Sequence, residues 1–348
     1  MYYPNIIRDF YNICGIETGG EKINDQFNLM LSLRIRIWAR YIGVDHANSH
    51  YVILAEEAKK DLRKRGKVLA LKRSGRIATE GLLALAQSEG KAAVVEINCE
   101  TDFVSRNEMF ESLALSLAKH VLMLEYNSQR VSGTHSIEPE SLQDSIINLQ
   151  SSKISGDTTV QNVLTEVAAM MGENISFRRG FVMCKPSHGV LCTYLHANQH
   201  PGLGRIAGLI SLEVQNGNSQ LPVLQRIGSE LAMHVVASKP LFLSKESVSS
   251  DALDSEHEII KSQAERLGKS PAALENIVEG RLRKFYEEVV LMEQKFIMND
   301  SISIVELLNN LSKEVRSPVN IKSFIRLEVS FNIIRYDLDA FSLDLPFL

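Results

Sequence analysis

The clearest metal-ligand spacing in the sequence belongs to His188, Cys192, His196 and His200, which recur every four positions. On a helix they would share one face and could bind zinc, which takes Cys and His ligands. The surrounding sequence instead favours a strand followed by a turn at "HPGLG". Strand residues four apart are separated by about 13 Å, at 3.3 Å per residue. One zinc ion cannot bridge that distance, so we expect no metal site here.

The other catalytic patterns are incomplete. "LGKS" at residues 267–270 has Gln263 where a phosphate-binding loop needs its first glycine. Ser238 and Lys239 stand before Pro240, and the end of a helix before a proline explains them better than a catalytic dyad. The chain contains no GxSxG, HExxH or dinucleotide-binding glycine motif. The sequence therefore predicts no enzyme and no cofactor.

The composition is that of an ordinary globular protein, with 45% hydrophobic residues, 23% charged residues and a net charge of −4. A length of 348 residues favours two or three domains. This charge gives no general attraction to nucleic acids, and no apolar run is long enough to span a membrane. Four widely spaced cysteines predict a reduced protein without a disulfide framework.

An internal repeat supplies the elements that must position any site. Strand–turn–strand patterns at Gly81–Ile97 and Gly189–Val214 are each followed by an amphipathic helix, at Phe110–Leu122 and Leu224–Val236. A duplication of this length predicts an α+β fold with two related core subdomains. The two helices carry histidines at matching places, which we interpret as packing residues: His120 and His234.

The N-terminal part is harder to interpret. Residues 1–54 show no clear period and stay unassigned, whereas residues 55–76 favour a helix broken at Gly66. The basic stretch at residues 59–76 leaves nucleic-acid binding open as an alternative function. A solvated helix face or a basic linker is favoured, because no aromatic side chains interleave for base stacking.

Three later segments have distinct patterns. Residues 126–160 are polar and rich in serine, which indicates a loop or linker. Residues 158–174 predict a helix capped by Thr158 or Thr159 and ended by Gly172. Residues 249–294 predict two charged helices joined by "GKSP", and we interpret them as an antiparallel coiled-coil arm that reaches a partner.

The stretch "NCETDFVSRNEMF" (Asn98–Phe110) lies where the apolar strand Ala92–Ile97 should pass into a helix. It places an acid and an aromatic residue, Asp102 and Phe103, side by side at this corner. The second copy of the repeat has no such pair after Val214. Since no catalytic constellation accompanies it, the pair favours a protein that acts on another protein.

Several motifs in order resemble one family, elongation factor Ts, the guanine nucleotide exchange factor for elongation factor Tu. They are "EINCETDFVSRN" (Glu96–Asn107), "GENISFRRG" (Gly172–Gly180), "LAMHVVASKPLF" (Leu231–Phe242), "VEGRLRKFYEEVVLMEQKFI" (Val278–Ile297) and "FIRLEV" (Phe324–Val329). The resemblance covers residues 55–329. The two ends, residues 1–54 and the tail 330–348, depart from the family pattern.

The resemblance implies a domain organisation that agrees with the repeat. It has a remnant of an N-terminal helical domain with a basic linker, two core subdomains and a projecting coiled-coil arm. The expected boundaries are 55–80 for the remnant, 81–180 for the first subdomain, 181–248 with 291–329 for the second, and 249–290 for the arm.

The resemblance also implies a mechanism without chemistry on this chain. The partner would be elongation factor Tu, in its GDP-bound and nucleotide-free states, with no nucleic acid or membrane involved. The motif Thr101, Asp102, Phe103 and Val104 would disturb the magnesium and phosphate site of that partner, so that GDP leaves and GTP can load. Further partner contacts would come from Met171, Gly172 and His196.

Two questions stay open at the level of sequence. The altered N-terminal region leaves room for a protein that binds elongation factor Tu but exchanges its nucleotide poorly. The motif wording and the serine-rich insertion near residues 126–157 resemble a plant mitochondrial form, which implies the mitochondrial matrix. No recognisable transit peptide is visible, so a bacterial-type cytoplasm is the alternative.

Overall fold

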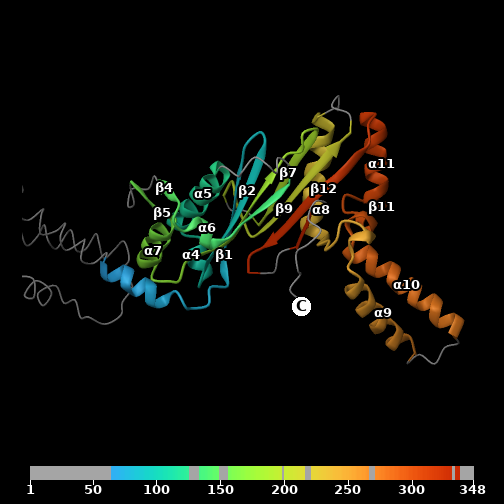
Figure 1. The fold of residues 1–348 in the computed structure, drawn as a ribbon, viewed down its shortest axis with the longest axis horizontal. Coiled ribbons are helices and arrows are strands. Elements are labelled where there is room, and N and C mark those ends of the chain that lie inside the picture. The colour runs from blue at the N-terminus through green and yellow to red at the C-terminus, as the bar shows by residue number, and fades with distance from the viewer. Residues whose placement is uncertain are drawn as a thin grey trace, which may run out of the picture.

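The computed structural model describes residues 64–124, 133–148, 156–197, 200–215, 221–265, 271–330 and 334–337. Its helices flank antiparallel sheets, so the predicted α+β class is confirmed (Figure 1). The division into domains stays a prediction.

The first sheet has five strands. Their order is β3 (Thr134–Ile137), β6 (Ser176–Cys184), β2 (Lys91–Cys99), β1 (Glu80–Gln87) and β8 (Leu203–Gly204), with all neighbours antiparallel. The helices around this sheet are α4 (Asp102–Ser105), α5 (Glu108–Met123), α6 (Pro139–Leu142) and α7 (Val160–Met171), and residues 64–73 are also helical.

The second sheet has four strands in the order β13 (Ile334–Asp337), β12 (Val319–Glu328), β9 (Ile206–Val214) and β7 (Gly189–His196). Helices α8 (Leu221–Ser238) and α11 (Ile304–Val315) cover its outer side (Figure 1). The remaining short elements are the strand pairs β4 (Ile146–Asn148) with β5 (Asp157–Thr159) and β10 (Lys295–Phe296) with β11 (Asn299–Ser303), and the turns η1 (Lys245–Ser247) and η2 (Leu291–Glu293).

The two sheets pack face to face, which explains the uninterrupted apolar runs of their central strands. In β2, Val95 and Ile97 point into the core beneath α5, whereas Val94 points toward the second sheet. In β9, Leu209 points toward the first sheet and packs in the same cluster as Val94, whereas Ile210 lies beneath α8. Because both faces of such a strand are buried, its residues are apolar in succession and do not alternate between apolar and polar types.

The repeated elements have the predicted order, with β1, β2 and α5 in one copy and β7, β9 and α8 in the other. Both copies begin at a glycine pressed against the neighbouring strand. A Cβ on Gly81 would lie 2.1 Å from the carbonyl oxygen of Ile97, and one on Gly189 would lie 1.9 Å from that of Leu212. Only glycine permits this approach. The predicted helix faces are buried, at Phe110, Leu113, Ala114, Leu117, Val121, Leu224, Ile227, Leu231 and Val235.

Two local predictions are wrong. The serine-rich segment 126–160 is not only a linker, because it contributes β3, α6, β4 and β5 in its described part. The helix break at Gly66 is also absent, since residues 64–73 are continuously helical. A Cβ on Gly66 would lie 3.2 Å from the Cβ of Ala169. The glycine therefore permits close packing against α7 and does not end the helix.

Helices α9 (Ser250–Glu265) and α10 (Pro271–Val289) run side by side and project away from the sheets (Figure 1). Ile260 of α9 is buried, and Ile277 of α10 is half-buried. The base of the pair is tied to the body through the N–H groups of Leu241 and Phe242, which donate to the carbonyl of Val289. Coiled-coil character stays a prediction, and the connecting residues 266–270 lie outside the described residues.

His234 is fully buried on α8 and holds the segment that follows α10. Its Nε2 lies 3.0 Å from Oε1 of Gln294, and the N–H of Ile297 lies 3.3 Å from its Nδ1. A ring that donates at one nitrogen and accepts at the other is neutral. Burial lowers the pKa of His234, although the bond to Gln294 partly opposes this effect. The predicted packing role is confirmed.

We therefore expect the protein to lose stability as the pH falls below about 6.5, the ordinary pKa of histidine. The unfolded chain takes up a proton at His234 there, whereas the folded chain resists protonation. The contribution is at most about 1.4 kcal/mol per pH unit. Urea unfolding at pH 7.5 and 5.5 measures it, and His234→Gln should reduce the difference. An equal pH dependence in the variant would assign the effect to other groups.

Candidate interaction site

The corner between β2 and α5 exposes the aromatic residue that the sequence singled out. Phe103 is 82% exposed, whereas Val104, the next residue in the four-residue helix α4, is 8% exposed and packs in the core. Val104 thus anchors the corner while Phe103 points outward. A large exposed aromatic side chain beside a rigid core is a feature of protein interaction sites.

Asp102 lies beside Phe103 and is accessible as well. Its carboxylate accepts a bond of 2.9 Å from the Arg106 guanidinium one turn later. The Arg106 side chain is largely exposed and that of Asp102 is half-exposed, so this ion pair contributes little to stability and can open at low cost. The corner therefore presents an acid and an aromatic ring together.

The C-terminus of α7 meets this corner. Thr159 caps the start of α7 and Gly172 ends it in a left-handed conformation with φ 75°, as the sequence predicted. The next residue, Glu173, accepts two bonds from Thr101: one from its N–H at 3.0 Å and one from its hydroxyl at 2.7 Å. The predicted contact residues Met171 and Gly172 are therefore brought close to residues 101–104.

In a second set of bonds, the donor is Asn174, the residue after Glu173. The Asn174 N–H donates to Glu100 Oε1 at 2.7 Å, and its side-chain amide donates to the carbonyls of Ser74 at 3.1 Å and Arg76 at 2.7 Å. Arg76 also pairs with Glu100 at 3.4 Å. The two motifs thus hold each other, together with the end of the N-terminal helix.

His196 lies exposed at the end of β7, outside these direct contacts. Its carbonyl accepts from the N–H of Arg205 at 3.0 Å, and the Arg205 guanidinium pairs with Glu80 at 2.7 Å. Glu80 is the register partner of Cys99 at the end of β2. His196 is therefore connected to the corner through two intermediates, on the same end of the strands.

Cys99 at the corner is no nucleophile. Burial, followed by the charges of Glu173 and Glu80, raises the pKa of its thiol to about 12. Its Sγ–H donates to the carbonyl of Thr101 at 3.1 Å. A thiol held neutral in this way is unreactive near pH 7.

The spaced histidines and cysteine form no metal centre. Cys192 is buried within β7, whereas His196 lies at the end of that strand, four residues later. His200 lies beyond the strand, and its Nδ1 is 3.1 Å from Oε1 of Glu111. Within the described ranges, no three His, Cys, Asp or Glu residues are grouped closely enough to hold an ion.

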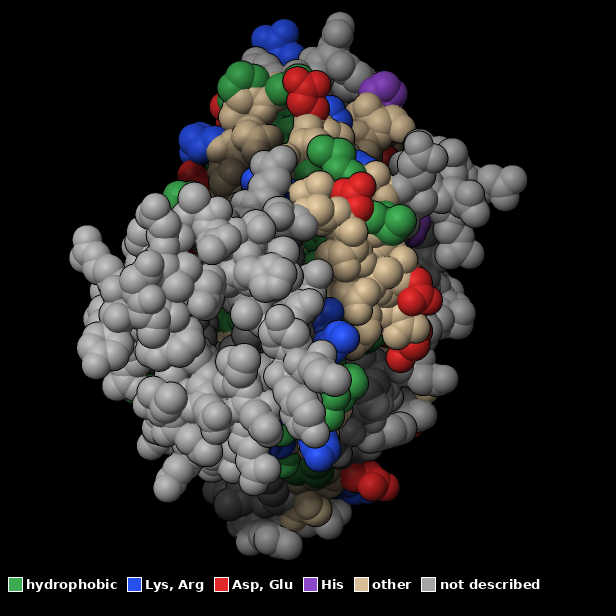
Figure 2. All heavy atoms as spheres, turned by 90° about the vertical axis from the view of Figure 1, so that its left-hand side faces the viewer, with side chains coloured by type: hydrophobic (Ala, Val, Ile, Leu, Met, Phe, Trp, Pro, Cys, Tyr) green, Lys and Arg blue, Asp and Glu red, His purple; other side chains and the backbone are tan. Residues whose placement is uncertain are grey.

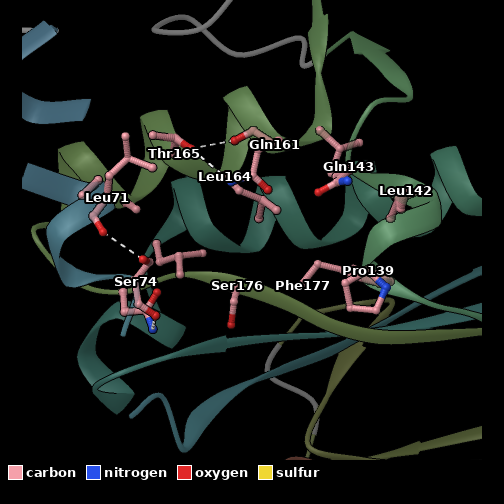
Figure 3. A pocket seen from close by; sticks show the side chains of 15 residues that line it. Leu71, Ser74, Pro139, Leu142, Gln143, Gln161, Leu164, Thr165, Ser176 and Phe177 are labelled. Atoms are coloured by element: carbon pink, nitrogen blue, oxygen red, sulfur yellow. Dashed lines mark hydrogen bonds between the residues drawn. The ribbon is translucent and has the colours of Figure 1, made fainter. Parts of the chain in front are cut away.

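A pocket of about 250 Å³ lies among the helix at residues 64–73, α6, α7 and the start of β6 (Figure 3). Leu71 and Ser74 border it on one side, Gln161 and Leu164 of α7 on another, and Phe177 lies at its base. None of its lining residues is ionisable. It therefore offers no acid–base chemistry and is small for a ligand pocket.

Two cations of the basic segment pair with acidic side chains in its described part. Lys67 pairs with Glu166 of α7 at 2.8 Å, as Arg76 does with Glu100. Acidic and basic side chains are intermingled on the described part of the face shown in Figure 2. None of the helices described here is both long and apolar enough to cross a membrane.

Comparison with known proteins shows which family the chain belongs to. A family model described as "Elongation factor TS" matches residues 100–330, beginning at Glu100 of the corner itself. The chain belongs to the elongation factor Ts family. It is accordingly a translation elongation factor and not a catalytic enzyme.

Two plant relatives are similar over most of their length. The chain is 67% identical to "Elongation factor Ts, mitochondrial" of Ricinus communis over 291 residues, 84% of this chain and 76% of the relative. It is 55% identical to the protein of that name from Arabidopsis thaliana over 337 residues, 96% of this chain and 85% of the relative. The second match reaches beyond residues 55–329, into segments that the motifs left unassigned. These names support an organellar form of the factor.

A bacterial relative is more distant. "Elongation factor Ts" of Paramagnetospirillum magneticum is 38% identical over 272 residues, 78% of this chain and 80% of the relative.

Glu100, Glu173 and Asn174 lie within the family-like motifs, but the sequence predicts no role for them. The bond from Thr101 to Glu173 joins positions 72 residues apart, and the bond from Asn174 to Glu100 joins positions 74 residues apart. No local spacing indicates such a pairing. The only indication of a contact in the sequence is that both motifs resemble the same family.

Proposed function

We propose that the chain binds elongation factor Tu in its GDP-bound form and promotes the release of GDP. The corner formed by Thr101, Asp102 and Phe103, with Val104 as its buried anchor, enters beside the magnesium and phosphate site of the partner. GDP then leaves, the nucleotide-free complex persists, and GTP displaces the factor. Met171, Gly172 and His196 make further contacts with the partner.

The single observation that carries this proposal is the exposure of Phe103 on a corner that is anchored by the buried Val104 and by hydrogen bonds to Glu173. A side chain that is 82% exposed on a body of fixed geometry can enter an apolar slot without rearrangement. Burial of a Phe side chain stabilises a complex by about 1.5–3 kcal/mol. Asp102 beside it brings a negative charge that competes for a cation or repels a phosphate.

The thermodynamics of exchange need no catalysis. A factor that binds the nucleotide-free partner more tightly than the GDP-bound partner weakens GDP by the same ratio. The two-sheet body presents the corner, and the pair α9 and α10 serves as a coiled-coil arm with a separate hold on the partner. The proposed site of action is the mitochondrial matrix, and the names of the plant relatives support the mitochondrion as the organelle.

Release of fluorescent GDP from elongation factor Tu tests the function directly. The rate should increase with the concentration of this chain and reach a plateau. A complex that forms without any acceleration at saturating concentration would identify a binding protein with impaired exchange, and the proposal would be wrong.

A further inference from the structure

We propose that Glu173 is a positioning residue for the exchange reaction, acting through Thr101 on the Asp102–Phe103 pair. The inference rests on the proposed function and names the residue that holds its working surface. Thr101 is the N-cap of α4, yet its side chain makes no bond to the helix that it begins. Its hydroxyl donates to Glu173 instead.

The hydrogen bonds to Glu173 hold the corner at Thr101, the residue that directly precedes the Asp102–Phe103 pair. Helix α4 has only four residues, which is too short to be stable by itself. Its first residue, Asp102, follows directly after Thr101, whose N–H and hydroxyl are both bonded to one carboxylate. Bonds to an ionised acceptor are stronger than neutral ones, and two of them restrict rotation as well as distance.

The carboxylate is itself held in place. Gly172 turns the chain at the end of α7, and the N–H of Asn174 bonds Glu100 on the other side of the corner. Glu173 is therefore flanked by two fixed backbone points. Residues 100–101 and 173–174 are joined by these three hydrogen bonds, which we call the clasp.

The clasp explains why the acid–aromatic pair lies beside the end of α7 and not on a free loop. A side chain that must enter a partner while the nucleotide leaves loses rate if its orientation varies. Glu173 touches neither GDP nor magnesium in this account. It keeps Phe103 in the orientation in which entry costs least.

The test compares four forms of the full chain in the GDP-release assay: the unaltered chain, Glu173→Ala, Glu173→Gln and Glu166→Ala. Glutamine can still accept from the Thr101 N–H and donate to its hydroxyl, so it should restore most of the activity. Glu166 is the matched control, because it lies on α7, the helix that precedes Glu173, and pairs with Lys67 away from the corner.

We expect Glu173→Ala to lower the maximal release rate roughly 10- to 100-fold while the half-saturating concentration changes much less. Glu166→Ala should match the unaltered chain. If Glu173→Ala melts much earlier than the unaltered chain, Thr101→Val, which removes only the hydroxyl, supplies the comparison and should show a smaller loss in the same direction.

A double-mutant cycle separates positioning from a general structural role. If Glu173 acts through Phe103, Glu173→Ala should have little further effect on the maximal rate in a Phe103→Ala background. Independent, multiplying effects would overturn the inference, and so would an unchanged rate in Glu173→Ala. No acceleration by the unaltered chain would instead overturn the proposed function, and this inference with it.

Discussion

Replacing Asp102 and Phe103 together with alanine is expected to lower the maximal rate of GDP release by roughly 10- to 150-fold, the factor that corresponds to the burial of one Phe side chain. The affinity for elongation factor Tu should change much less, because other surfaces also bind the partner. Phe103 is 82% exposed in the free protein, so its removal leaves no cavity in the core. The folded state should therefore remain intact.

Met123→Ala is the matched control for this variant. Met123 is 76% exposed at the other end of α5, so its loss removes a similar exposed apolar group outside the corner. It should leave the release rate unchanged. The intrusion mechanism is contradicted if the double variant loses affinity while each complex that forms still releases GDP at the original rate.

Glu96→Ala is expected to have the largest effect on stability, about 3–5 kcal/mol, because it leaves buried positive charge without its partner. Glu96 is fully buried on β2 and accepts from Arg179 at 2.6 Å and Arg178 at 3.1 Å. It also accepts at 2.7 Å from the N–H of Ser330, which follows β12. Burial lowers the pKa of Arg179 and the charge of Glu96 partly opposes this.

A loss of this size is a large share of the 5–15 kcal/mol that stabilises a typical domain. Urea unfolding followed by circular dichroism measures it. Glu166→Ala, which removes a partly exposed ion pair with Lys67, should cost about 1 kcal/mol or less. A cost for Glu96→Ala as small as that of the control would show that the arginines find other partners or reach water.

Local chemistry made parts of the fold predictable from the sequence. Thr159 and Gly172 bound α7 as expected, because a cap and a left-handed terminus depend on residues within one turn. The repeat predicted the strands and helices around Gly81 and Gly189 for a similar reason, since their apolar spacing is local.

Other parts depend on partners far away in the chain. Strand β3 lies in a polar, serine-rich segment and exists because it pairs with β6. The face-to-face packing of the sheets was likewise not visible in the apolar runs, which a buried helix would also explain.

The candidate site divides in the same way. Asp102 and Phe103 could be singled out because an exposed-type residue and a core-type residue stood together at a strand-to-helix corner. The supports of that corner, Glu173 and Asn174, come from a turn more than 70 residues later, and only tertiary structure joins them.

The dependence of GDP release on magnesium tests the central claim most directly. The acceleration by saturating chain is measured on GDP-bound elongation factor Tu with Mg²⁺ present and after its removal by a chelator. If the Asp102–Phe103 corner acts by disturbing the magnesium site, part of its work is already done once the ion is gone, and the acceleration factor should shrink. An equal factor under both conditions would contradict the account.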